Sequence, residues 1–67
     1  MNEIQVNGES RTFESAITIG QLLVELGVPV ETTLVEHNRQ VVPRTEFDST
    51  RIEEGDVLEL VRLVGGG

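Results

Sequence analysis

Cysteine is absent from the 67 residues of this chain. Without thiols the chain forms no disulfide, holds no thiolate-bound metal and offers no cysteine nucleophile. Its single histidine, His37, has no second His or Cys with which to complete a metal site, so the sequence favours a surface histidine over a ligand. We therefore expect neither a metal site nor a cofactor bound by the chain itself.

Lysine is absent as well. The five basic residues are all arginine and are opposed by 12 acidic residues, which gives a formal net charge of −7. Such an acidic chain repels nucleic-acid phosphates and anionic membranes, and it favours a positively charged protein partner through long-range steering. The lack of a Gly-rich phosphate loop with its lysine also excludes a Walker-type ATP site. We expect protein partners, with no nucleic acid and no membrane.

Long apolar runs are also missing. No segment approaches the ~20 apolar residues that span a bilayer, and the first residues lack the basic and apolar regions of a signal peptide. The expected location is therefore the cytoplasm.

The apolar content nevertheless supports one small core. Leu, Ile, Val and Phe make up 23 of the 67 residues, well above the roughly 20% below which chains tend to stay unfolded. A domain of this size buries only ~60% of its unfolded surface, so an internal substrate pocket would compete with the core. We expect one domain at residues 1–64, a flexible Gly-rich tail at residues 65–67, and no enzymatic activity of its own.

The first third of the chain predicts a hairpin followed by a short helix. Alternating residues around Ile4 and Val6 lead into Asn7-Gly8, a pair typical of tight hairpin turns, and a mostly polar edge strand follows at about residues 10–15. Next, Thr18 and Gln21 match a capping box that precedes an apolar stripe at helical spacing. Gly27 is expected to end this helix after about two turns. The stripe consists of Ile19, Leu22, Leu23 and Leu26.

The rest of the chain predicts three more strands. Leu34-Val35 and Val41-Val42 flank a turn at Asn38-Arg39, and Pro43 stops the second of these strands. A polar connector then carries Phe47 as an anchor into the core, together with Ile52. The apolar residues 57–64 predict a central strand. The expected fold class is α+β, with a mixed sheet of about five strands and one helix on one face.

The sequence ends in Gly65-Gly66-Gly67, directly after the most apolar predicted strand. Glycine lacks a Cβ atom, so such a tail has a minimal cross-section and its carboxylate is sterically open to attack. Four residues beyond Leu63 reach about 13 Å, far enough to enter a narrow channel in another protein. We expect the three glycines to enter the active site of a partner.

Three features together resemble the ThiS family of sulfur carriers in thiamine biosynthesis. They are the terminal Gly66-Gly67, the turn and strand EGDVLELV at residues 54–61, and the segment NRQVVPR at residues 38–44. The resemblance covers the whole chain, and an extra glycine at Gly65 is its one departure. It implies a ubiquitin-like β-grasp fold, in agreement with the order of elements predicted above.

The resemblance also implies a carrier cycle centred on Gly67. A ThiF-like adenylyltransferase, using ATP and Mg²⁺, would convert its carboxylate to an acyl-adenylate, and sulfur derived from cysteine would then replace AMP to leave a thiocarboxylate. A ThiG-like thiazole synthase would take that sulfur. In this cycle the chain is a protein cosubstrate, and its adenylation and thiocarboxylate site is Gly67.

Docking needs a surface next to the tail. Strand alternation places Val61 and Leu63 on the face opposite Leu58 and Leu60. If the helix covers the latter pair, then Val61 and Leu63 are expected to be exposed as a partner docking surface. Arg44, after Pro43, is expected to cap local carbonyls rather than to contact a partner.

Two alternatives of the same fold stay open from the sequence. The chain resembles the small subunit of molybdopterin synthase less closely, since that family usually has a longer chain, and such a carrier would serve another pathway. A ubiquitin-like protein modifier would instead join Gly67 to lysines of other proteins. The sequence leaves open which pathway receives the sulfur and whether the chain forms oligomers.

Overall fold

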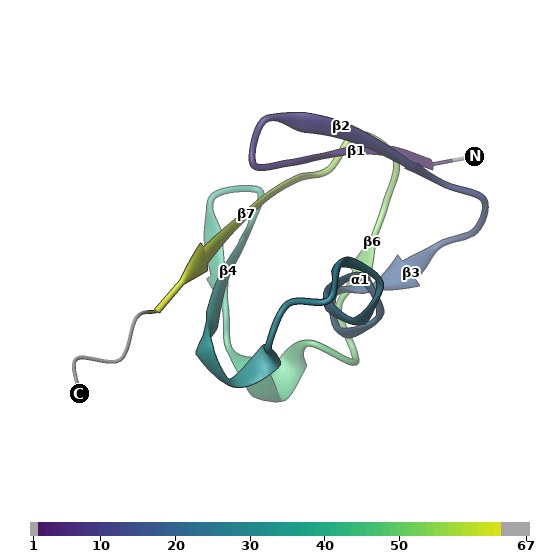
Figure 1. Ribbon diagram of the computed structural model, residues 1–67. Coiled ribbons are helices and arrows are strands. Elements are labelled where there is room, and N and C mark those ends of the chain that lie inside the picture. The colour runs from purple at the N-terminus through teal and green to yellow at the C-terminus, as the bar shows by residue number, and fades with distance from the viewer. Residues whose placement is uncertain (1, 64–67) are drawn as a thin grey trace.

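The computed structural model describes residues 2–63 as a mixed five-stranded sheet with a helix on one face, together with a small two-stranded sheet (Figure 1). Strands of the large sheet lie in the order β2-β1-β7-β4-β5. This arrangement confirms the predicted α+β class and the ubiquitin-like β-grasp fold. The elements are β1 (Asn2–Val6), β2 (Glu9–Phe13), β3 (Ile17–Thr18), α1 (Ile19–Leu26), η1 (Val30–Thr32), β4 (Thr33–His37), β5 (Gln40–Val42), η2 (Arg44–Glu46), β6 (Arg51–Ile52) and β7 (Val57–Arg62).

Both predicted hairpins are present, and each turns on an asparagine. Asn7 and Gly8 have φ angles of 52° and 82°, and Asn38 and Arg39 have φ angles of 52° and 73°. These positive angles are those of a two-residue turn whose twist matches that of the flanking strands. The turns fix the registers of β1 with β2 and of β4 with β5. As predicted, β2 lies at one edge of the sheet.

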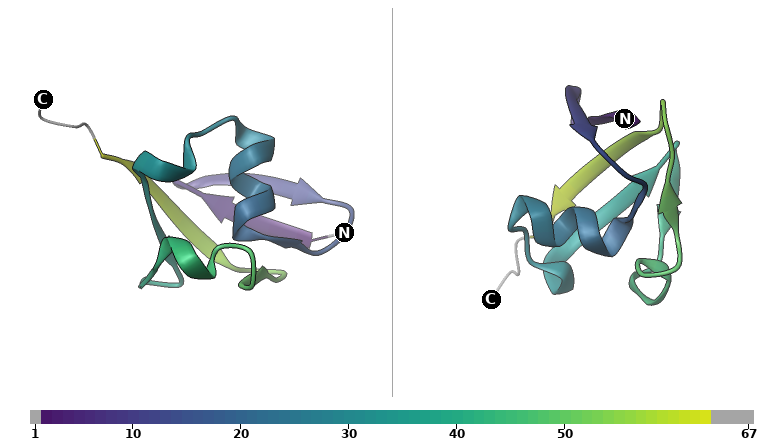
Figure 2. Two further views of the ribbon diagram at one scale, coloured as in Figure 1. Left: turned by 90° about the horizontal axis from the view of Figure 1, so that it is seen from below. Right: turned by 90° about the vertical axis from the view of Figure 1, so that its right-hand side faces the viewer.

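Helix α1 begins and ends at the predicted caps. The side chain of Thr18 accepts a hydrogen bond from the Gln21 N–H at 3.2 Å, while the Gln21 side chain accepts one from the Thr18 N–H at 2.8 Å. Gly27, with a φ of 71°, forms the left-handed cap at the other end. Two views in Figure 2 show α1 lying on one face of the sheet. The helix is held there by burial of its apolar stripe, because eight residues alone do not form a stable helix.

The central strand is β7, as predicted. It pairs in parallel with β1 and antiparallel with β4, so both of its edges are occupied. Leu58 is fully buried and Leu60 is half-buried on the helix side. The buried apolar core comprises Ile4, Val6, Ile19, Leu22, Leu23, Val35, Phe47, Ile52 and Leu58. Phe47 and Ile52 are therefore the core anchors that the sequence indicated.

The small sheet of β3 and β6 was not predicted from the sequence. Its two strands have two residues each, and Ile17 lies opposite Ile52 in an antiparallel register. Two residues carry no recognisable periodicity, and the pairing depends on segments more than 30 positions apart. The backbone carbonyls of Phe47 and Thr50 also accept hydrogen bonds from the first N–H groups of α1, from Gly20 and Ile19 respectively. The long connector is thus attached to the start of the helix.

Within residues 2–63, the structure has no helix that is both long and apolar enough to cross a membrane.

Candidate functional site

The predicted reactive tail follows strand β7 in the sequence. The three glycines Gly65, Gly66 and Gly67 lie outside the described residues, as does the end of the predicted strand at residue 64. The described chain ends at Leu63, whose backbone N–H donates a hydrogen bond of 2.7 Å to the carbonyl of Thr32. Leu63, the last described residue, is therefore fixed to the body of the domain through η1.

The surface beside this point is apolar, as the sequence predicted. Val61 and Leu63 retain 49% and 52% of their accessible surface, although Val61 lies in the central strand β7 and Leu63 directly follows it. Their neighbours Leu58 and Leu60 point to the opposite side, toward α1. We call the side of the large sheet that faces away from α1 the outer face. The expectation that Val61 and Leu63 are exposed is confirmed.

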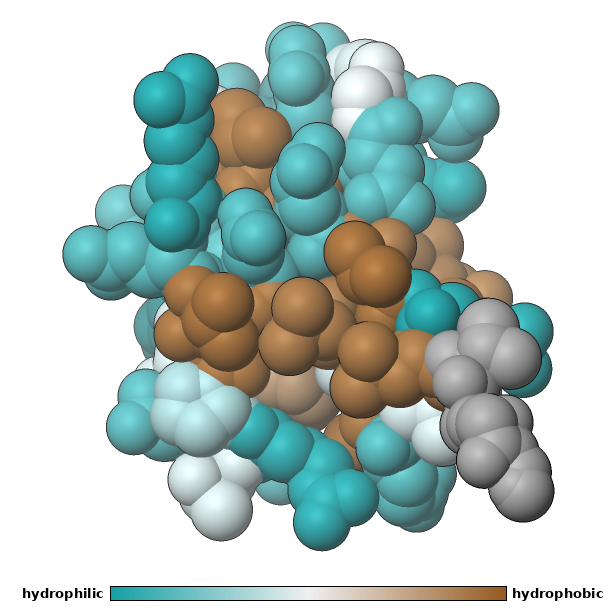
Figure 3. Space-filling view, turned by 90° about the vertical axis from the view of Figure 1, so that its left-hand side faces the viewer, coloured by the Kyte–Doolittle hydropathy of each residue, from teal (hydrophilic) through white to brown (hydrophobic). Residues whose placement is uncertain are grey.

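Other strands add to this surface. Leu34 on β4 lies directly opposite Val61, and Val41 on β5 lies opposite Glu36, so both side chains belong to the outer face. Val41 is 57% exposed. Leu34, Val41 and Leu63 also line a common groove on this side of the molecule. Figure 3 shows the band of apolar side chains that crosses this side, with hydrophilic side chains above and below it. We call Leu34, Val41, Val61 and Leu63 the apolar patch.

Exposed clusters of large aliphatic side chains are unfavourable in water, so this patch is a candidate surface for protein contact. The patch adjoins the point where the chain leaves β7. The apolar patch is therefore a candidate docking surface that includes Leu63, the last described residue.

At the opposite end of β7, a polar cluster holds two turns together. His37 Nε2 lies 2.7 Å from Asp56 Oδ2, and their side chains are only 20% and 15% exposed. Asp56 also accepts hydrogen bonds from the Asn38 side chain at 3.2 Å and from the Glu53 N–H at 2.8 Å. Burial raises the pKa of Asp56, but these hydrogen bonds outweigh it, and its pKa lies below the ordinary value of 3.8.

His37 is thus less exposed than its position in the sequence indicated, and it has a structural partner. Within residues 2–63 no group of three His, Cys, Asp or Glu side chains is arranged to hold a metal ion. The His37–Asp56 pair lies at the start of β7, whereas the chain continues toward the tail from its other end. The hydrogen bonds of this pair connect the β4–β5 turn with the turn before β7.

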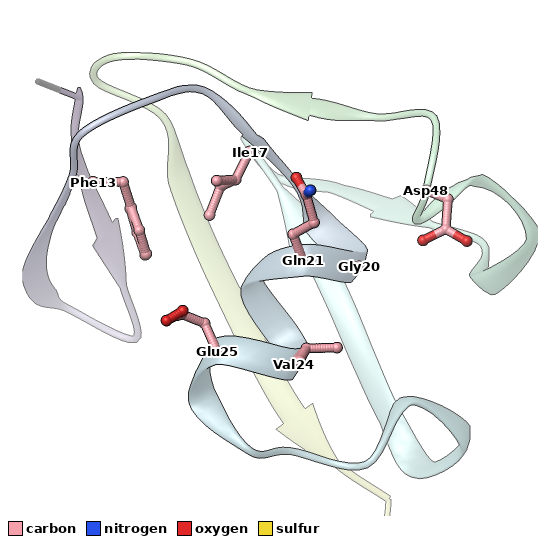
Figure 4. A pocket seen from close by; sticks show the side chains of 7 residues that line it. All are labelled: Phe13, Ile17, Gly20, Gln21, Val24, Glu25 and Asp48. Carbon is pink, nitrogen blue, oxygen red and sulfur yellow. The ribbon is translucent and has the colours of Figure 1, made fainter.

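A second surface feature lies over helix α1. A cavity of about 440 Å³ is lined by Phe13, Ile17, Gly20, Gln21, Val24, Glu25 and Asp48. Figure 4 shows that Phe13 and Ile17 lie on one side of the helix and Asp48 on the other. Val24, which is 77% exposed, projects from the helix itself. The cavity is therefore a shallow surface around the helix, on the side of the sheet opposite the apolar patch.

The predicted capping role of Arg44 is not seen. Its side chain is exposed and makes no hydrogen bond or ion pair with another residue of the described part of the chain. Its backbone carbonyl accepts a hydrogen bond from the Phe47 N–H instead. The side chain lines the groove that Leu63 and Val41 also line, next to the apolar patch. Arg44 is therefore placed at the edge of the candidate docking surface.

Comparison with known proteins gives a family match over nearly the whole chain. The model of the ThiS family matches residues 4–67. A crystal structure of the thiamine biosynthesis protein ThiS from Geobacter metallireducens superposes with a TM-score of 0.85 at 34% sequence identity, covering 97% of this chain and 99% of that one. A sulfur carrier protein ThiS from Thermus thermophilus is 33% identical over 64 residues, covering 96% of this chain and 98% of that protein.

Another relative is an enzyme in which the similar region is one part. A thiazole synthase from Paramagnetospirillum magneticum is 38% identical over 65 residues, which are 97% of this chain but only 20% of the enzyme. This chain therefore spans about a fifth of the length of that relative. The family match and the full-length similarity in sequence and structure agree, and the chain belongs to the ThiS family.

Proposed function

We propose that this chain is a sulfur carrier protein of thiamine biosynthesis and that it acts as a protein cosubstrate rather than as an enzyme. The observation that carries the proposal is the family match over residues 4–67, which includes the terminal glycines. The carrier protein of Thermus thermophilus is similar over 64 residues, which are 96% of this chain. The position of the apolar patch beside the start of the tail supports the same role.

The proposed chemistry takes place at the carboxylate of Gly67. A terminal carboxylate has an ordinary pKa of ~3.5, so at neutral pH it is ionised and is a poor electrophile. Adenylation supplies the missing leaving group: a carboxylate oxygen attacks the α-phosphorus of ATP, and pyrophosphate leaves. Sulfur derived from cysteine then displaces AMP, and the product is a thiocarboxylate on Gly67.

The proposed partners supply every other component of this cycle. A ThiF-like adenylyltransferase binds ATP and Mg²⁺, and a ThiG-like thiazole synthase receives the sulfur for thiazole formation. The thiazole synthase of Paramagnetospirillum magneticum contains a region similar to 97% of this chain, which supports the second partner. The partners contact the domain on the apolar patch, and Gly65, Gly66 and Gly67 enter their active sites.

Intact-mass spectrometry tests the proposal. The chain is incubated with ATP, Mg²⁺, its cognate adenylyltransferase and a cysteine-derived sulfur source. The expected result is a mass shift that corresponds to exchange of one oxygen for sulfur, located at Gly67 by fragmentation. A chain that lacks Gly67 serves as the control and is expected to keep its thermal unfolding midpoint while losing the shift.

Three results would contradict the proposal, the last of them only in its pathway. With active partners, an unchanged mass would exclude the carrier cycle. Adducts that join Gly67 to lysines of other proteins would instead identify a ubiquitin-like modifier. Transfer of the sulfur to a molybdopterin precursor rather than to thiazole would keep the carrier chemistry but change the pathway.

A further inference from the structure

Two glutamates lie side by side on the outer face. In the antiparallel register of β4 and β7, Glu36 is directly opposite Glu59. Their strand neighbours Val35 and Leu58 are fully buried on the helix side, so both glutamates point away from α1. Directly opposite residues have Cβ atoms about 4.5–5.5 Å apart. The two carboxylates therefore share one region of the surface.

Aliphatic side chains border this glutamate pair. Along β7, Glu59 is flanked on the same face by Val57 and Val61, which are 43% and 49% exposed. Across β4, Glu36 lies opposite Val41, and the next pair of the same ladder is Leu34 with Val61. The glutamate pair thus borders the apolar patch and does not form a separate acidic surface.

No cation of the described chain neutralises the pair. The ion pairs between residues 2 and 63 are Arg11 with Glu9 and His37 with Asp56. On β7 the nearest arginine, Arg62, alternates to the side that carries Leu58 and Leu60. Like charges directly opposite in a sheet reduce the free energy of unfolding. The arrangement of Glu36 and Glu59 therefore opposes folding stability and has no internal compensation.

This pair restricts what can cover the apolar patch. A purely apolar partner surface would remove water from two carboxylates without replacing their hydrogen bonds, which is strongly unfavourable. A partner with a positively charged side chain at the matching position would replace that water with charge-assisted hydrogen bonds and relieve the repulsion. Arginine fits best, because its planar group has several donors and is less strongly hydrated than an ammonium group.

We propose that the partner docking on the outer face inserts one cationic side chain, an arginine by preference, between Glu36 and Glu59, and surrounds it with aliphatic side chains that cover the apolar patch. This inference rests on the proposed function, because it takes the adenylyltransferase as the docking protein. It makes the glutamate pair a determinant of partner choice. Two copies of this chain do not pair through their outer faces, since that arrangement would bring four carboxylates together.

The test compares two charge-matched double variants of the full chain. Glu36→Gln with Glu59→Gln removes the proposed contact and keeps the shape of both side chains. Glu14→Gln with Glu25→Gln removes the same amount of charge from two exposed positions away from the outer face. Glu14 lies in the connection between β2 and β3, and Glu25 lies on α1. Affinity for the cognate adenylyltransferase is measured by isothermal titration calorimetry at low and at high salt.

We expect the Glu36→Gln, Glu59→Gln variant to bind the adenylyltransferase at least about tenfold more weakly than the unchanged chain. The affinity of the Glu14→Gln, Glu25→Gln variant is expected to fall by less than about threefold. We also expect the first variant to unfold at the same or a higher temperature, because a repulsive pair has been removed. Equal weakening of binding by both variants would show that the net negative charge attracts the partner without a specific contact, and it would overturn the inference. Unchanged binding of the first variant would overturn it as well.

The unchanged chain separates failure of the inference from failure of the proposed function. If it is converted to the thiocarboxylate while both double variants react equally well, the carrier role stands and the glutamate contact is wrong. If it neither binds nor reacts, the proposed function fails, and the inference falls with it. Self-association of the unchanged chain in analytical ultracentrifugation, if lost in the Val61→Gln variant, would identify a second copy as the occupant and would also overturn the inference.

Discussion

The side chain of Asn7 is hydrogen-bonded to the backbone of Leu60 at both of its polar groups. Its Oδ1 accepts from the Leu60 N–H at 2.7 Å, and its Nδ2 donates to the Leu60 carbonyl at 3.3 Å. Strand β1 ends at Val6, one residue before this contact. The amide of Asn7 therefore continues the pairing of β7 where the backbone of β1 has already turned away.

Replacing Asn7 with glycine is expected to loosen this part of β7. Glycine tolerates the φ of 52°, so the substitution removes the side-chain hydrogen bonds and leaves the turn intact. We expect the free energy of unfolding to fall by about 1–3 kcal/mol, measured by chemical denaturation. Hydrogen exchange of the Leu60 amide is expected to accelerate more than that of Leu58. Unchanged protection of Leu60 would contradict the role given to Asn7.

Stability is expected to fall in acid partly because of Asp56. Its pKa in the folded protein lies below the ordinary value of 3.8, since hydrogen bonds to the ionised form outweigh the effect of burial. Ionised Asp56 therefore stabilises the folded state above that ordinary value, and the stabilisation is lost as the pH falls through the lower folded-state pKa. Urea denaturation at pH values between about 6 and 2 measures this dependence.

The variant Asp56→Asn is expected to be less stable at neutral pH and to show a shallower decline in acid. Asp48→Asn provides the control, because Asp48 is exposed and its side chain makes no hydrogen bond with another residue of the described segment. Parallel pH profiles for the two variants would mean that the Asp56 hydrogen bonds do not influence acid stability.

Binding to the adenylyltransferase is expected to depend on Val61 but not on Val24. Both valines are exposed, at 49% and 77%, but Val61 lies in the apolar patch and Val24 lies on the helix. Substituting glutamine for Val61 is expected to weaken binding by about tenfold, because an aliphatic contact area is lost. Val24→Gln is expected to bind like the unchanged chain, and calorimetry distinguishes the two.

Thermal unfolding of both variants is the accompanying control. Each side chain is exposed, so a drop in the free energy of unfolding of less than about 1 kcal/mol is expected. A much larger loss for Val61→Gln would show that Val61 belongs to the core. Equal weakening of binding by the two variants would place the docking surface on the helix side or show that it extends around the domain.

Gly20 is expected to tolerate alanine although the new Cβ would come too close to Asp48 Oδ1. The contacted atom is the end of an exposed side chain that can rotate into solvent, and the nearest backbone atom, the Phe47 carbonyl oxygen, is 3.7 Å away. Alanine inside a helix is favoured over glycine by about 0.5–1 kcal/mol. We therefore expect Gly20→Ala to raise the unfolding temperature slightly.

Gly27→Ala provides the contrast to Gly20→Ala. Gly27 has open space around it but a φ of 71°, so alanine at this position is strained and is expected to lower stability by about 1 kcal/mol. Calorimetric unfolding of both variants measures the difference. A loss of stability for Gly20→Ala as large as that for Gly27→Ala would show that the Asp48 side chain in the loop after η2 cannot move away from the new methyl group.

Local signals made most of the fold predictable. The capping box at Thr18, the glycine cap at Gly27 and the Asn7-Gly8 turn each depend on residues a few positions apart, and each was found as predicted. Exposure of Val61 followed from strand alternation once the helix was assigned to one face. The part of the apolar patch formed by Val61 and Leu63 was therefore predictable from the sequence, whereas the contribution of Leu34 and Val41 depends on strand pairing.

Contacts across long sequence separations were not predictable in the same way. Asn7 and Leu60 are 53 positions apart, and His37 and Asp56 are 19 apart. Their meeting depends on the register of β7 between its neighbours, which no local pattern specifies. The Glu36–Glu59 pair has the same origin. Asn7 and Asn38 were correctly assigned to turns. The hydrogen bonds of their side chains to Leu60 and Val57 on β7 could be seen only in the folded structure.

The central place of β7 has a mechanical consequence. A force applied at Leu63, as when a partner draws on the residues beyond it, acts along the axis of this strand. Hydrogen bonds to β1 on one edge and to β4 on the other run across that axis, so they are loaded in shear together rather than peeled apart one by one. Traction on the tail is thereby shared by two interfaces, and the domain resists being unravelled from its own end.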